Sequence, residues 1–207
     1  MIPYGTFTFF LIAFIVLIPV IILGFLGKRS YIYNGISTAI MIVLIFSSDK
    51  HNLFGQKYLS VQLLSFIIYV IWQVALIMFY YKSRQKNNTF AKFVTVMVLS
   101  ILPLALVKIL QSTWLGGHQI HFHESKLIEF VGFLGISYVT FKSVQLIMEI
   151  RDGSIKEIKV GKLIQFISFF PTISSGPIDR YKRFVKDDKK VPTGAVSYTH
   201  LTLPTTP

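Results

Sequence analysis

Three histidines in the stretch GGHQIHFHES could bind a metal ion. His118, His121 and His123 are followed by Glu124, so the nitrogen and oxygen ligands that zinc uses stand close together in the sequence. An extended segment would place His121 and His123 on one face. Zinc sites usually draw at least one ligand from a distant element, and two glycines precede this cluster. We therefore predict a solvated loop here and no metal site.

Lys142 and Glu149 are ionisable residues within the mainly apolar stretch 127–150, which also carries Glu129 near its start. On a helix they are two turns apart and share a face. Ionisable side chains at membrane depth usually face a bundle interior or a cavity, so we predict that Lys142 lines a cavity. Gly135 lies nearby, and as a small residue it predicts a close approach of a neighbouring helix.

A complete catalytic site is missing from the sequence. No nucleophile, base and orienting group stand together, and there is no glycine loop of the kind that binds phosphate. The chain has no cysteine, which excludes disulfides and thiolate chemistry of its own. Any thiol in a reaction must come from a partner.

The stretch FFPTISSGPIDRYKRF, residues 169–184, breaks at two prolines and then becomes basic. A helix over residues 162–170 would rise only about 13 Å, roughly half of the hydrocarbon thickness. We predict that residues 163–190 enter the membrane from the cytoplasmic side and return to it. A plain interfacial helix that ends at a proline turn is the alternative.

Broken backbone at membrane depth is tolerated only inside protein or beside a watery cavity. The broken segment is therefore predicted to line a cavity that opens to the cytoplasm, through Ser174, Ser175, Gly176 and Pro177.

The first four charged residues after the broken segment are Asp179, Arg180, Lys182 and Arg183. Asp179 and Arg180 are predicted to lock it where the chain turns back, the carboxylate accepting backbone or guanidinium hydrogen bonds. A purely structural turn is an equally good interpretation. Lys182 and Arg183 are candidates for contact with a soluble partner or with a lipid phosphate.

The composition indicates a membrane protein. Hydrophobic residues make up 53% of the chain, charged residues 14%, and the mean hydropathy is +0.60. We expect an all-α, polytopic transmembrane fold of about five spans plus the re-entrant segment. The spans are expected over the apolar runs 7–26, 31–48, 58–81, 93–114 and 127–150.

Lysine and arginine are concentrated in alternate loops, at residues 28–29, 82–92 and 151–162. Such loops usually face the cytoplasm, so the amino terminus is predicted to lie outside a cell membrane. The net charge of +12 suits an anionic inner leaflet and could also attract an acidic soluble partner; nucleic acid is not expected. Residues 1–193 are predicted to form one membrane domain, and the Thr- and Pro-rich residues 194–207 a non-native tail.

Two stretches carry a family resemblance. FLGISYVTFKSVQLIMEIRDG (133–153) and FISFFPTISSGPIDRYKRF (166–184) resemble the membrane-bound O-acyltransferase (MBOAT) family, in particular its DltB-type branch of Gram-positive bacteria. The matching motifs are GISY (135–138), RDG (151–153) and SGPIDR (175–180). Over residues 1–193 the arrangement of the predicted membrane spans is also similar to that of the family. The resemblance implies that the chain is an amino-terminal fragment of an MBOAT-type domain.

The resemblance implies an activity that the residues alone do not show. In the family, a cytosolic D-alanyl carrier protein presents D-alanine as a thioester on its phosphopantetheine. The membrane protein, with other membrane proteins of the pathway, passes it toward teichoic acid on the outer face. The chain itself would bind no cofactor. Alternatives are a polysaccharide O-acetyltransferase of the same family, or a transporter or scaffold subunit.

The family's catalytic residue is a histidine in a later part of the chain. No histidine of this sequence matches it, so no catalytic residue is assigned here, and this fragment is expected to be inactive alone.

Overall fold

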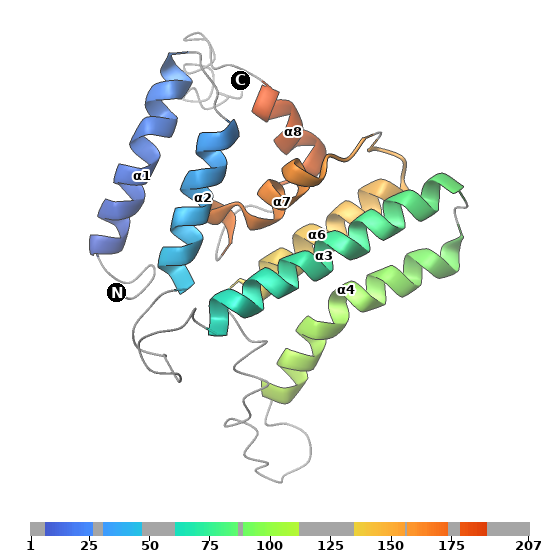
Figure 1. Ribbon diagram of the computed structural model, residues 1–207. Helices are drawn as coiled ribbons and strands as arrows, with labels where there is room; N and C mark the ends of the chain where they lie inside the picture. The colour runs from blue at the N-terminus through green and yellow to red at the C-terminus, as the bar shows by residue number, and fades with distance from the viewer. Residues whose placement is uncertain are drawn as a thin grey trace, which may run out of the picture. The chain divides into compact units, whose positions relative to one another are not determined.

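The computed structural model describes residues 7–26, 31–46, 61–86, 89–111, 135–155, 157–173 and 179–189. These residues form helices and short connections without a β-strand (Figure 1), which confirms the all-α fold class. The chain divides into two compact units, residues 1–49 with 185–207, and residues 50–184. Each unit is described by itself. The predicted boundary near residue 193 stays a prediction.

The first unit contains two uncharged helices in contact with each other, α1 (Phe7–Phe25) and α2 (Tyr31–Phe46). Apolar side chains such as Phe9 and Met41 are buried, yet many others on the same helices are exposed. A helix that is apolar on all sides is typical of a membrane setting.

The second unit is built on three helices that all contact one another: α3 (Val61–Lys86), α4 (Phe90–Gln111) and α6 (Ile136–Arg151) (Figure 1). Residues 62–86 and 90–109 are long and apolar enough to cross a membrane. This finding, with the composition, supports a membrane protein. The expected number of about five spans stays a prediction.

Polar side chains join the three helices in their interior. Gln73 of α3 and Ser100 of α4 exchange two hydrogen bonds: Gln73 Nε2 donates to the Ser100 carbonyl (3.0 Å), and Ser100 Oγ donates to Gln73 Oε1 (2.7 Å). The hydroxyls of Tyr69 and Thr140 join α3 to α6 at 2.6 Å. Such interhelical bonds stabilise helix association where no water competes.

Ser100→Ala is expected to lower the free energy of unfolding by about 1 kcal/mol, because Gln73 Oε1 loses its donor inside the bundle. Thermal unfolding in detergent measures the change. Thr95→Ala on the same helix is the matched control, since Thr95 is exposed and its hydroxyl donates to the Ala91 carbonyl of its own helix. Equal effects of the two substitutions would contradict this role of Ser100.

The RDG motif forms the turn that ends α6. The Gly153 amide donates to the Ile150 carbonyl (3.1 Å) and the Ser154 amide donates to the Glu149 carbonyl (3.1 Å). This pair of bonds is the Schellman arrangement, which requires a left-handed residue after the helix. Gly153 has φ +75° and meets that requirement.

The region of the two prolines contains short helices: α7 (Val160–Ser168), the 3₁₀ turn η3 (Phe170–Thr172) and α8 (Tyr181–Lys189). The helix expected over residues 162–170 is observed as α7. It ends at Ser168 because Phe169, with ψ 108°, leaves the helical conformation before Pro171. At about 1.5 Å per residue, α7 is too short to cross a bilayer.

Candidate functional site

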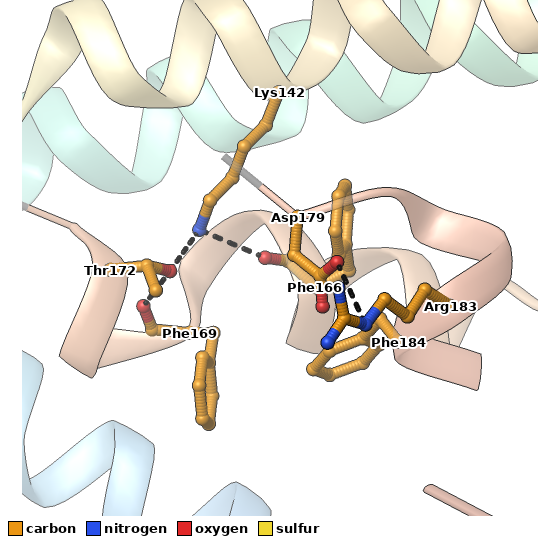
Figure 2. Close-up of a pocket in the computed structure, with 7 residues that line it drawn as sticks. All are labelled: Lys142, Phe166, Phe169, Thr172, Asp179, Arg183 and Phe184. Carbon is orange, nitrogen blue, oxygen red and sulfur yellow. Dashed lines mark hydrogen bonds and ion pairs between the residues drawn. The ribbon is translucent and has the colours of Figure 1, made fainter. Parts of the chain in front are cut away.

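Lys142 connects α6 to the broken segment. Its side chain is only 2% exposed. The ammonium donates to the Phe166 carbonyl at 3.3 Å and to Thr172 Oγ1 at 2.5 Å (Figure 2). It also lies 5.7 Å from the centroid of the Phe166 ring. A buried ammonium needs such partners, because burial without hydrogen bonds is strongly unfavourable.

These contacts explain how the break between α7 and η3 is held. The Phe166 carbonyl is one of the last four of α7, which have no partner within the helix. A cation at this end also interacts favourably with the helix dipole. Thr172 Oγ1 in turn donates to the Phe169 carbonyl at 3.1 Å. Lys142 therefore caps α7 from a neighbouring helix and fixes the turn that follows.

Gly135 makes a second connection between α6 and the broken segment. It is the N-cap of α6 with φ +90°, a conformation that residues with a Cβ rarely adopt. A Cβ there would overlap the Ile173 carbonyl oxygen and lie 2.7 Å from Ile173 Cγ2. The GISY motif thus begins with a glycine because the backbone after η3 passes directly against it.

A cavity of about 380 Å³ lies beside Lys142 (Figure 2). Two phenylalanines approach a third, Phe184 of α8: the ring centroids of Phe166 and Phe169 lie 5.4 Å and 5.7 Å from its centroid. The cavity combines these rings with polar groups, so it can hold a small group that has both polar and apolar parts. Its lining residues are Lys142, Phe166, Phe169, Thr172, Asp179, Arg183 and Phe184.

The chain that follows the break carries two ion pairs. Asp179 Oδ1 accepts the Arg180 amide (2.9 Å) and lies 3.8 Å from Arg183 Nε. Arg180 Nε lies 4.0 Å from Glu149 Oε1 of α6; the Arg180 side chain is 78% exposed and that of Glu149 only 14%. Asp179 thus pairs with the Arg183 guanidinium. The Arg180 guanidinium pairs with Glu149 of α6. The arginine of each pair is largely exposed, and an ion pair with a solvated partner contributes little to stability, so the role of both pairs is mainly orientation.

The structure brings together three of the predicted site residues, Lys142, Asp179 and Arg183, at the cavity. Lys182 is exposed on α8. Two predicted groups lie outside the described residues: Ser174, Ser175, Gly176 and Pro177 of the break, and His118, His121 and His123 of the possible metal site. The function of all these residues stays a prediction.

Thr172 and the three phenylalanines of the cavity were not predicted from the sequence as site residues. The aromatic residues were visible as an apolar run. Nothing in the sequence indicated that Thr172 would accept a hydrogen bond from a lysine of another helix, because that contact depends on how α6 and η3 pack.

The described residues define an all-α membrane protein in which a buried lysine holds a broken helix. No family model matches the chain. Three proteins named teichoic acid D-alanyltransferase are similar to 92% of it: from Bacillus subtilis (48% identical over 191 residues), Lacticaseibacillus rhamnosus (45% over 193) and Streptococcus thermophilus (34% over 190). Over most of its length the chain is similar to these DltB-type proteins, in agreement with its motifs. It spans 45%, 43% and 41% of the length of these relatives.

Proposed function

We propose that the protein of which this chain forms part transfers D-alanine from a carrier-protein thioester toward teichoic acid. The observation that carries this proposal is the identity of 34–48%, over 92% of the chain, with three proteins named teichoic acid D-alanyltransferase. An O-acetyltransferase or a transporter has no comparable support.

The proposed chemistry is acyl transfer. A hydroxyl oxygen of the acceptor attacks the thioester carbonyl of D-alanine, an ester C–O bond forms, and the C–S bond breaks. The sulfur leaves as the thiol of the carrier's phosphopantetheine and receives the proton that the hydroxyl loses. This chain has no cysteine, and in the proposal the thiol belongs to the carrier. No residue of this chain is assigned as the base.

In this proposal the chain supplies part of the cytoplasmic side of a multi-pass membrane protein whose amino terminus lies outside. Residues 163–190 enter from the cytoplasm and return to it, so the cavity beside Lys142 faces the compartment of the carrier. The basic loops favour an anionic leaflet, and they would also steer an acidic carrier protein toward this side.

The test uses the full-length protein in proteoliposomes, a carrier charged with labelled D-alanine, and teichoic acid. We expect labelled D-alanyl ester on the polymer. The same carrier charged with an acetyl group is the control and should give less ester. Acetyl transfer without D-alanyl transfer would contradict the proposal and favour a polysaccharide O-acetyltransferase.

A further inference from the structure

Two polar groups without a hydrogen-bond partner lie at the end of α3 that leads into α4. The Tyr80 side chain is 1% exposed, and its hydroxyl has no partner. One turn further on, Arg84 Nε is also buried without a partner. Buried polar groups are normally satisfied, so two unsatisfied donors together indicate a missing acceptor.

Arg151 of the RDG motif extends this cluster. Its guanidinium carbon lies 4.3 Å from the centroid of the Phe93 ring and 5.3 Å from that of Phe90. The Tyr80 ring approaches the same Phe93 ring, with 6.1 Å between the two centroids, and Arg84 lies one helical turn from Tyr80 on α3. Asp152, which is exposed, follows Arg151. Two guanidinium groups and a phenol hydroxyl are thus near one another where α3, α4 and α6 meet.

The turn after α6 keeps Arg84 in this place. The backbone of Gly153 approaches it so closely that a Cβ there would lie 3.2 Å from Arg84 Nη2. In the part of the chain that the structure describes, neither Arg84 nor Arg151 forms an ion pair with a carboxylate. A cation–π contact leaves the N–H groups of Arg151 able to bind an acceptor.

The cluster lies where the apolar part of α3 ends. Residues 61–81 carry no charge, and Lys82, Arg84 and Lys86 follow. The span 62–86 has 25 residues, so at about 1.5 Å each it exceeds the ~30 Å of hydrocarbon and its last turns reach the headgroup layer. Phosphate is the anion found at that depth.

We propose that Tyr80, Arg84 and Arg151 form a binding site for the phosphate of an anionic phospholipid. Guanidinium groups match phosphate oxygens in a bidentate geometry, and the phenol adds a third donor. The apolar rings of Phe90 and Phe93 beside Arg151 would contact the glycerol and the first acyl carbons. This site does not depend on the proposed acyl transfer.

The test is a titration of the full-length protein in detergent with phosphatidylglycerol, followed by native mass spectrometry, with phosphatidylcholine as the reference lipid. Arg84→Gln or Arg151→Gln should weaken phosphatidylglycerol binding about tenfold, and Tyr80→Phe about threefold. The matched control is Lys86→Gln, which removes one charge from an exposed position of the same helix and should change the affinity less than about twofold. If an arginine variant does not fold, Tyr80→Phe keeps both charges and decides the question.

Three results would overturn the proposal. Lys86→Gln could weaken binding as much as Arg84→Gln, which would indicate diffuse surface charge. Inorganic phosphate could bind as tightly as phosphatidylglycerol, which would indicate a site for a soluble anion. The arginine variants could weaken binding of an acidic carrier protein and leave phosphatidylglycerol binding unchanged, which would assign the cations to a protein partner.

Discussion

Gly135→Ala is expected to destabilise the second unit by about 3 kcal/mol or more. Two effects add. Alanine is strained at φ +90°, and its Cβ would overlap the Ile173 carbonyl oxygen, which belongs to backbone and cannot rotate away. To relieve this overlap, the start of α6 and the backbone after η3 must move apart. Thermal unfolding of the purified protein in detergent measures the loss.

Gly35→Ala is the matched control for this substitution. Gly35 lies within α2, and a Cβ there would meet nothing within 4 Å. Since alanine is the better helix former, stability should be unchanged or should rise by up to about 1 kcal/mol. A Gly135 variant as stable as the Gly35 variant would show that Ile173 does not pass against the start of α6.

Lys142→Met is expected to reduce D-alanyl transfer by the full-length protein by about tenfold or more while changing its melting temperature little. The Phe166 carbonyl and Thr172 Oγ1 both lose their donor, an unfavourable change of about 1–3 kcal/mol for a buried group. Removal of a buried ammonium offsets much of this in the global stability. The lost hydrogen bonds therefore weaken mainly the turn that forms one wall of the cavity, and the global stability changes little.

Hydrogen exchange separates this local effect from unfolding. The amides of Thr172 and Ile173, which bond to the Phe169 and Phe170 carbonyls, should exchange about tenfold faster in Lys142→Met, since ~1.4 kcal/mol corresponds to a factor of ten. Lys108→Met, at an exposed lysine of α4, is the control and should leave exchange and transfer unchanged. Wild-type protection of both amides in the Lys142 variant would contradict the capping role.

The sequence predicted the helices well and their ends less well. The apolar runs 58–81, which is uncharged, and 93–114, which is interrupted by Lys108, indicated where α3 and α4 lie, because hydrocarbon requires about 20 apolar residues. The helices themselves, Val61–Lys86 and Phe90–Gln111, extend past the apolar run at the loop between them. Charged residues such as Lys86 and Lys92 are compatible with a helix whose end lies in the headgroup layer, so hydropathy does not mark where it stops.

The part of the site that could be predicted from the sequence is the one where a charged residue lies in an apolar stretch. Lys142 stood out because an ammonium in an apolar stretch must face a polar partner, and the structure places it at the cavity. Gly135 was interpreted as a contact between helices, whereas its neighbour is the backbone of Ile173 at the end of η3. Contacts between segments far apart in sequence, such as Lys142 with Thr172, depend on packing and left no local pattern.

The central proposal is that the chain from α7 to α8 enters and leaves the membrane on the cytoplasmic side. This part of the protein has no cysteine, so the substitution Lys186→Cys introduces one thiol here. Labelling of that thiol shows on which side of the membrane the end of α8 lies. We predict that a membrane-impermeant thiol reagent labels it in inverted vesicles and not in intact cells. Labelling from outside intact cells would place the end of α8 on the outer face and would contradict a cavity that opens toward the cytosolic carrier.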